Sequence, residues 1–457
     1  LDKTLKLENF SIATNGDIER SYLKPNKILL NPFTKKKIDS IDFKETKFEL
    51  RYNSKNQNLI SFKGKYSLDN KNFSNFNINN DLKSSNNSTK LNLNLLEPID
   101  IEIINNKKNI GVNSKIESEF NFNKNFFLIK NFIFTEKNNS IVIKDLKLNK
   151  VKQFISVKKI KIDTKNNNFT IALDDKVSII GDKYDASNLS KILDNTNENN
   201  FLKNLNKDVL IRLAEIKTSL PKQIKSFNLI GKIEKGKFIK INSKGEFSDD
   251  KFLDISLHFN RDTRKKYLEI FSGEPEPLLS NYKFFKGLTG GNMLFISNFD
   301  ENSSESNISI ENFKVKNAPG FVKLLSLADL GGMADLVSGD GLSFEKMEIK
   351  FSKDKKILKI EELYAIGPSI SILMDGYVEN KTGLTSIRGT MVPAKTLNTL
   401  ISKIPIVGDI VIPKDVGEGL FGISFKMKGL PGEMKTSVNP IKTLTPRFIQ
   451  KALNKTK

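Results

Sequence analysis

Residues 90–97 read KLNLNLLE, with leucines at 91, 93 and 95 that alternate with Lys90, Asn92 and Asn94. Successive side chains of a β-strand point to opposite faces, so this period of two places leucine on one face and lysine or asparagine on the other. The same alternation recurs in residues 47–53, 58–69 and 140–149 and in many later segments. Counting them gives about twenty candidate strands separated by Asn-rich turns, which predicts antiparallel, meandering sheet and no βαβ units.

About twenty amphipathic strands would present a large apolar face that must be covered. Strands spaced about 4.8 Å apart would extend over about 95 Å in a single sheet, which a few short helices cannot cover. Such a sheet could close into a barrel, fold into a sandwich, or curl into a trough that holds an apolar ligand. The alternation therefore predicts a mainly β fold and leaves these three arrangements open.

Three segments carry helical signals instead of strand alternation. In residues 202–216 the apolar side chains fall on one helical face, Pro319 and Gly339 mark the two ends of a second segment, and residues 394–403 form a third, short one. The predicted organisation is a repetitive antiparallel β body over residues 1–185, a helical insertion over 186–225, a continuing β body over 226–300 and a distinct C-terminal region over 301–457.

The composition limits the chemistry available to the chain. It has no cysteine and one histidine, His258, which excludes a disulfide framework, a cysteine-ligated metal site and a multi-histidine metal site within the chain. Residues 417–422 match the G-x-G-x-x-G pattern, but Phe421, Ile423 and Phe425 alternate like a strand where a dinucleotide site needs a helix. No catalytic residues, metal or cofactor are predicted, and we expect a protein that is not an enzyme.

The formal net charge of +21 raises the question of nucleic-acid binding. Only seven of the 74 basic residues are arginine, the side chain that grips phosphates and guanine edges bidentately. The lysines are scattered along the strands and seldom cluster. We interpret the charge as the solvated face of amphipathic strands. A cationic nucleic-acid binder is a further alternative, which the low arginine content argues against.

The C-terminal region carries a family resemblance. Its most specific pieces are GTMVP at 389–393, IPIVGD at 404–409 and VNP at 438–440. Over nearly the whole segment from 318 to 453, and in order, the sequence resembles the C-terminal region of AsmA-like proteins, and most of all the YhdP-type members of the AsmA/TamB superfamily of bridge-like lipid transfer proteins. The motif residues are Gly389, Pro393, Pro405, Gly408, Asn439 and Pro440.

This resemblance implies an elongated antiparallel β-sheet curled into a trough, with a few short covering helices. It also implies a protein of the Gram-negative periplasm, anchored in the inner membrane, that moves phospholipids towards the outer membrane and supports outer-membrane biogenesis. The alternative is a non-enzymatic envelope scaffold that affects the assembly or targeting of outer-membrane proteins through a protein partner. The sequence begins at Leu1 and has no apolar run near the ~18 residues of a membrane span, so we expect a fragment that lacks its anchor.

A trough of this kind would solvate phospholipid acyl chains, which gain about 0.8 kcal/mol per CH₂ kept from water. The residues expected to line it are one phase of each strand, and the alternative for each of them is ordinary sheet core. These candidates are Phe48, Leu50, Ile60, Phe62, Leu91, Leu93, Ile141, Ile143, Phe169, Ile171, Ile255, Leu257, Ile370, Ile372, Ile423 and Phe425.

Overall fold

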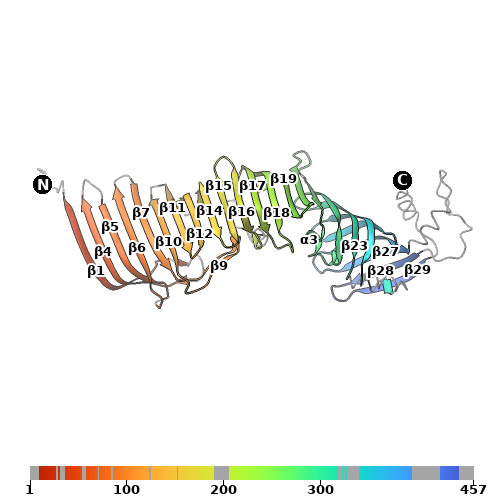
Figure 1. Cartoon of the computed structure of the whole chain (residues 1–457), viewed down its shortest axis with the longest axis horizontal. Coiled ribbons are helices and arrows are strands. Elements are labelled where there is room, and N and C mark those ends of the chain that lie inside the picture. The colour runs from red at the N-terminus through yellow and green to blue at the C-terminus, as the bar shows by residue number, and fades with distance from the viewer. Residues whose placement is uncertain are drawn as a thin grey trace, which may run out of the picture. The chain divides into compact units, whose positions relative to one another are not determined.

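The computed structural model shows a mainly β, mostly antiparallel protein, as predicted (Figure 1). It describes residues 10–441, apart from 27–28, 31–36, 54–57, 70, 84–85, 123–124, 152, 190–204, 318–321, 323–324, 327–338 and 394–421. The chain divides into two compact units, Leu1–Phe238 and Ile239–Lys457. Each unit is described separately below.

Unit 1 consists of long strands whose apolar and polar residues alternate. Their bounds are β1 Ser11–Leu23, β2 Leu29–Leu30, β3 Lys37–Ile38, β4 Ile41–Asn53, β5 Asn58–Ser67, β6 Ser74–Lys83, β7 Asn86–Leu95, β8 Ile99–Ile101, β9 Asn106–Lys108, β10 Ser114–Phe122, β11 Phe126–Glu136, β12 Asn139–Asn149, β13 Phe154–Ser156, β14 Lys159–Thr164, β15 Asn167–Leu173, β16 Val177–Asp185, β17 Lys207–Lys217 and β18 Ile224–Glu234.

The main sheet of unit 1 follows the chain order almost without interruption. It runs β1-β4-β5-β6-β7-β10-β11-β12-β14-β15-β16-β17-β18, and the short β13 pairs with the end of β12 that β14 does not reach. The pair β16–β17 is parallel, whereas the other pairs described in this sheet are antiparallel. Because β1 pairs only with β4 among the described residues, it forms an open edge of the sheet.

The segment between β7 and β10 leaves this sheet, and we call it the strap (residues 96–113). It contains β8 and β9, which pair with each other, and between them the 3₁₀ helix η1, Glu102–Ile104. Strands β7 and β10 lie side by side, with Leu95 opposite Ser114, so the strap is an excursion from one end of that pair. In Figure 1, β9 lies at the lower ends of the strands, near β16.

The predicted helix over residues 202–216 is wrong from Lys207 onward, because β17 occupies Lys207–Lys217. Val209, Ile211 and Leu213 lie on one face of this strand, and each has a partner on both β16 and β18. The β-branched Val209 and Ile211 favour this extended conformation, and sheet pairing overrides the helical spacing of the leucines. The predicted helical insertion over 186–225 is therefore strand at 207–217, and residues 190–204 lie outside the described part of the chain.

Unit 2 is also an antiparallel meander, in the order β19 to β29. Its elements are β19 Lys237–Ser248, β20 Lys251–Phe259, β21 Lys266–Ser272, α3 Glu276–Leu279, η2 Lys283–Phe285, β22 Leu288–Phe299, β23 Ser304–Val315, β24 Leu342–Lys353, β25 Ile357–Ile366, β26 Ile370–Glu379, β27 Thr385–Pro393, β28 Gly422–Gly429 and β29 Lys435–Ile441. Gly422 opens a strand, as the alternation of Ile423 and Phe425 predicts.

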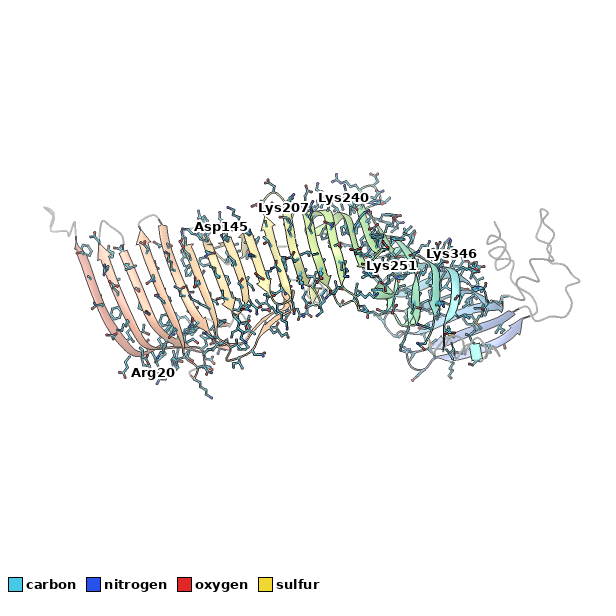
Figure 2. All side chains as sticks on the ribbon, viewed as in Figure 1. Arg20, Asp145, Lys207, Lys240, Lys251 and Lys346 are labelled. Atoms are coloured by element: carbon cyan, nitrogen blue, oxygen red, sulfur yellow. The ribbon has the colours of Figure 1, made fainter. Side chains whose placement is uncertain are left out.

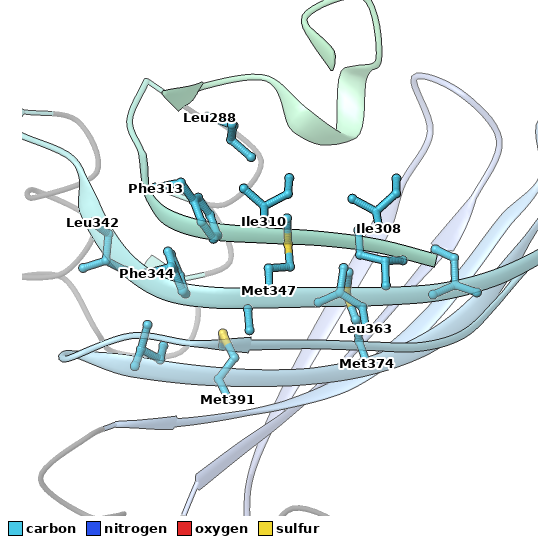
Figure 3. Close-up of a cluster of buried hydrophobic side chains, with 14 of the residues drawn as sticks. Leu288, Ile308, Ile310, Phe313, Leu342, Phe344, Met347, Leu363, Met374 and Met391 are labelled. Carbon is cyan, nitrogen blue, oxygen red and sulfur yellow. The ribbon is translucent and has the colours of Figure 1, made fainter. Parts of the chain in front are cut away.

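The hydrophobic core of unit 2 gathers side chains from successive strands (Figure 3). Ile310, Met347 and Met391 come from β23, β24 and β27, and the ring of Phe313 stacks on that of Phe344 with centroids 5.2 Å apart. The second predicted helix contributes where it is described, since Leu325 is fully buried in this cluster and Ser326 Oγ donates to the carbonyl of Val322 at 3.0 Å. The third predicted helix, 394–403, lies outside the described residues.

Candidate functional site

The apolar side chains of unit 1 are aligned from strand to strand by the register of the sheet. Directly opposed residues on neighbouring strands share a face, so a chain of opposed pairs forms a row across the sheet. Phe48 lies opposite Phe62, Phe62 opposite Ile78, and Ile78 opposite Leu91. Continued in the same way, the row that we call the upper row comprises Phe48, Phe62, Ile78, Leu91, Ser118, Phe132, Ile143, Ile160, Ile171, Ile179, Ile211 and Leu229.

A second row runs beside it on the same face, two residues along each strand and nearer the strap. We call it the lower row; it comprises Phe76, Leu93, Ile116, Phe134, Ile141, Ile162, Phe169, Gly181, Leu213 and Phe227. Neighbouring members of a row are about 4.8 Å apart, so the upper row forms an apolar track of about 50 Å interrupted only by Ser118.

The structure brings most of the predicted candidates of unit 1 together. Phe48, Phe62, Leu91, Ile143 and Ile171 belong to the upper row, and Leu93, Ile141 and Phe169 belong to the lower row. The remaining pair, Leu50 and Ile60, are directly opposite each other two residues beyond Phe48 and Phe62. Sequence reasoning missed other members, among them Ile160 and Ile162, although the alternation of residues 159–164 marks them equally well.

The candidates of unit 2 also fall in register, but most of them are core residues. Met391 lies between Ile372 and Ile423, and Phe425 pairs with Gly389. Ile370, Ile423 and Phe425 are buried in the hydrophobic cluster, Ile372 packs against that cluster, Leu257 is buried and Ile255 is half-buried. Ordinary sheet core accounts for Ile370, Ile423 and Phe425, so the candidate site is the apolar face of unit 1.

The two rows of unit 1 differ in exposure on several strands. On β12, β14 and β15 the lower-row side chains Ile141, Ile162 and Phe169 are only 8%, 6% and 4% exposed. Their upper-row neighbours on the same strands, Ile143, Ile160 and Ile171, are only partly buried. On these strands the upper row therefore keeps some accessible apolar surface, and the lower row does not.

Polar contacts hold the strap against the lower ends of the strands. The Tyr184 hydroxyl donates to the carbonyl of Ile103 at 3.0 Å, and Asn167 Nδ2 donates to the carbonyl of Ile104 at 2.8 Å. The ring of Tyr184 contacts that of Phe169, with centroids 4.9 Å apart, which places these contacts at the edge of the lower row. Ile99 and Ile104 of the strap are buried and provide its apolar anchor.

Asp185 is the buried charge of this contact, with a side chain 1% exposed. Its carboxylate accepts hydrogen bonds from Ser187 Oγ at 2.5 Å and from Asn105 Nδ2 of the strap at 3.1 Å, and Lys217 Nζ lies 3.5 Å away. Burial by itself raises the pKa of Asp185, but these hydrogen bonds and the lysine charge outweigh it and hold the pKa below its usual value. Asp185 is therefore ionised at neutral pH. Residues 105–109 carried only a turn signal, which gives no indication of this role.

The opposite face of the sheet is mostly polar and carries many of the charges, although Ile180 and Ile230 on it are 47% and 63% exposed. Ion pairs such as Lys65 Nζ to Glu45 Oε2 at 2.6 Å and Lys183 Nζ to Glu215 Oε2 at 3.9 Å are solvent-exposed. In Figure 2, Asp145 and Lys207 lie at the upper ends of the strands of unit 1 and Arg20 lies at the lower ends. Exposed pairs of this kind contribute little to stability, and they support the interpretation of the lysines as a solvated face.

Other sequence candidates fit structural roles. His258 is an exposed side chain of β20 that lies against Tyr267, with ring centroids 4.8 Å apart. No group of three or more His, Asp or Glu side chains that could hold a metal occurs among the described residues. Within that same part of the chain, no helix has the length and apolar character needed to cross a membrane.

The motif residues of the C-terminal region lie at strand positions where they are described. Gly389 is in β27, Pro393 ends that strand, and Asn439 and Pro440 are in β29 opposite Ser424 and Ile423. The motif residues Pro405 and Gly408 lie outside the described residues. Comparison with protein-family models, with curated proteins and with solved structures finds no match to this chain.

Proposed function

We propose that this chain binds phospholipid acyl chains along the apolar face of unit 1 and passes them along the sheet without chemical change. The sequence resemblance to AsmA-like proteins implies the setting of this activity, a periplasmic bridge between the inner and outer membranes of a Gram-negative bacterium. The proposal includes anchoring in the inner membrane. Phospholipid is the proposed ligand, and no cofactor is required.

The observation that carries the proposal is the alignment of the upper row, most of whose apolar side chains are only partly buried. Side chains such as Ile143, Ile160 and Ile171 form adjacent opposed pairs on successive strands and remain partly accessible. Contiguous exposed apolar surface is rare on a soluble protein unless it meets a partner or ligand. An extended acyl chain fits this surface because each CH₂ removed from water contributes about 0.8 kcal/mol, without need for a specific polar contact.

The same geometry explains how a lipid could move. The row repeats the same kind of apolar contact at intervals of about 4.8 Å. An acyl chain that moves along the row therefore exchanges one set of contacts for an equivalent set and meets no strongly favoured position. The charged headgroup would stay in water, because its burial without a partner would cost several kcal/mol. Transfer by this route needs a continuous apolar track and no catalytic residue.

The test is lipid photo-crosslinking to a benzophenone amino acid placed at Ile160, in vesicles that contain phosphatidylethanolamine. We expect a lipid adduct in the parent protein and its loss in Ile171→Asp, because Ile171 lies directly opposite Ile160 and the substitution puts a charge in the track. The matched control is Thr170→Asp, one residue earlier on β15 and on the opposite, polar face beside Lys161. Circular dichroism and urea unfolding establish that both variants are folded.

The Thr170→Asp control tests whether the loss of the adduct is specific to a charge in the upper row. An adduct that persists in folded Ile171→Asp, or that is lost equally in Thr170→Asp, would contradict binding along the upper row. Mass spectrometry of the purified protein gives a second readout. Copurified phospholipid supports the proposal, whereas a stoichiometric protein partner without lipid would support the scaffold alternative.

A further inference from the structure

The strap lies beside the lower row of unit 1 at β15, where Asn167 and Tyr184 bind it close to Phe169. On β12, Ile143 of the upper row lies nearer the middle of the strand than Ile141 of the lower row, and on β15 Phe169 and Ile171 are equally far from the middle. Position along the strand would therefore bury the upper row at least as well, yet Ile141 and Phe169 are buried, whereas Ile143 and Ile171 are only partly buried. A cover at the lower strand ends accounts for this difference.

Burial of the lower row varies from strand to strand. On β7, where the strap departs, Leu91 and Leu93 are both partly buried, and on β18, beyond the contacts described for the strap, Leu229 of the upper row is buried and Phe227 of the lower row is only partly buried. Phe76 on β6, where no contact with the strap is described, is buried against the rings of Tyr66 and Phe43. The strap is therefore a local cover of the lower row, beside Phe169 on β15 where its contacts lie.

The strap is held in one position by directional contacts. Its carbonyls at Ile103 and Ile104 accept hydrogen bonds from Tyr184 and Asn167, and its Asn105 donates to Asp185. These partners come from β15 and β16, four to five strands away from β10 in the sheet order, so both ends of the strap's path are fixed. Hydrogen bonds fix distance and direction, which apolar contact alone does not.

We propose that the strap sets the path of the acyl chain. It excludes the acyl chain from the lower row and confines it to the upper row and to the strand ends farther from the strap. This inference rests on the proposed function and adds a specificity element to it. The strap forms one wall of the track, and the headgroup is then directed away from the strap. Removing the strap would widen the track to include the lower row.

The experiment compares two positions on one strand, with and without the strap. Phe169 represents the lower row and Ile171 the upper row, and each is replaced in turn by a benzophenone amino acid for crosslinking to phosphatidylethanolamine. The strap variant replaces residues 96–113 by an Asn-Gly turn. Because Leu95 and Ser114 are directly opposed on antiparallel strands, a two-residue hairpin turn can join them.

We expect crosslinking at position 171 in both proteins. At position 169 we expect about tenfold less adduct in the parent protein and a rise to the level of position 171 in the strap variant, as for a site protected by a closed cover. Equal amounts of adduct at both positions of the parent protein would overturn the inference, and so would the absence of an adduct at position 169 in the strap variant. Absence of adducts at both positions in both proteins would reject the proposed function itself.

A lipid-free measurement keeps the two conclusions apart. The chain has no cysteine, so Phe169→Cys and Ile171→Cys each introduce a unique thiol. Maleimide should label Cys-substituted position 169 about tenfold more slowly than position 171, and the strap variant should abolish the difference. Should the strap variant fail to fold, Asn167→Ala combined with Tyr184→Phe removes two anchoring hydrogen bonds and decides the question by the same readout. Unchanged protection at position 169 in that folded double variant would count against the strap as the cover.

Discussion

Asn167 of β15 donates a 2.8 Å hydrogen bond to the carbonyl oxygen of Ile104, a residue 63 positions earlier in the chain. The same side-chain amide accepts a 2.8 Å hydrogen bond from the backbone N–H of Asp185. Its side chain is almost fully buried, so neither bond is replaced by water. One asparagine thus joins the strap to the ends of two strands of the main sheet.

Replacement of this residue by alanine should loosen the strap. In Asn167→Ala, the carbonyl of Ile104 and the N–H of Asp185 lose their partners while buried, which costs about 1–3 kcal/mol of the free energy of unfolding. Urea unfolding followed by circular dichroism measures this loss. The matched control is Asn168→Ala, because Asn168 is half-buried and its amide only donates to Asp163 Oδ1 at 3.2 Å. A control loss as large as that of Asn167→Ala would refute the special role of Asn167.

The strands of this protein could be predicted from the sequence because their signal is local. A period of two in side-chain polarity reports directly on the two faces of a strand, and the opposed pairs Phe48–Phe62 and Ile160–Ile171 show that the predicted phases meet on one face. The antiparallel order follows as well, since short turns between consecutive strands allow little else. The mainly β fold therefore follows from the sequence pattern alone.

The strap and β17 could not be predicted because their determinants are remote in sequence. Val209, Leu213 and Ile216 satisfy helical spacing, and only the pairing of β17 with β16 and β18 selects the strand. In the strap, Asn105 bonds to Asp185, 80 residues later. No local pattern specifies such a pair, and asparagine in a turn has a simpler explanation, namely turn formation itself.

Unit 2 should be stabilised mainly by its hydrophobic cluster. Ile310 of β23 is 0% exposed and lies between Met293 and Met347 on the neighbouring strands. Ile310→Ala should therefore lower the free energy of unfolding by about 2–5 kcal/mol, through lost burial and a residual cavity. The control Leu294→Ala, on the exposed face of β22, should lower it by less than about 1 kcal/mol. Thermal or urea unfolding monitored by circular dichroism distinguishes these results, and equal losses would contradict the assigned core.

Gly389 should be required for the packing of β27 against its neighbours. A Cβ at this position would lie 2.4 Å from Cζ of Phe425 and 2.7 Å from Cβ of Met374. Gly389→Ala should cost about 1–3 kcal/mol, as for other overpacked cores. In the double variant Gly389→Ala with Phe425→Leu, the shorter side chain relieves the closest contact, so alanine at 389 should cost less than it does beside phenylalanine. A double-mutant cycle with no coupling between the two positions would show that the contact does not limit stability.

The strap should stay docked across the neutral range and loosen in acid. The pKa of Asp185 is lowered because its hydrogen bonds from Ser187 and Asn105 and the charge of Lys217 outweigh the effect of burial. A carboxyl group whose pKa is lower in the folded than in the unfolded state stabilises the fold above the unfolded value, about 3.9, and this contribution is lost as the pH falls through the folded value. Tyr184 does not titrate in this range, because burial and the Asp185 charge raise its pKa to about 12. The free-energy difference between the parent protein and Asp185→Asn should therefore be constant from about pH 5 to 8, at about 1–3 kcal/mol, and shrink below about pH 4. Urea unfolding of both proteins across this range measures the difference. A difference that instead grows as the pH falls would mean that the carboxylate is destabilising in the folded protein, since only then does its protonation favour the docked strap.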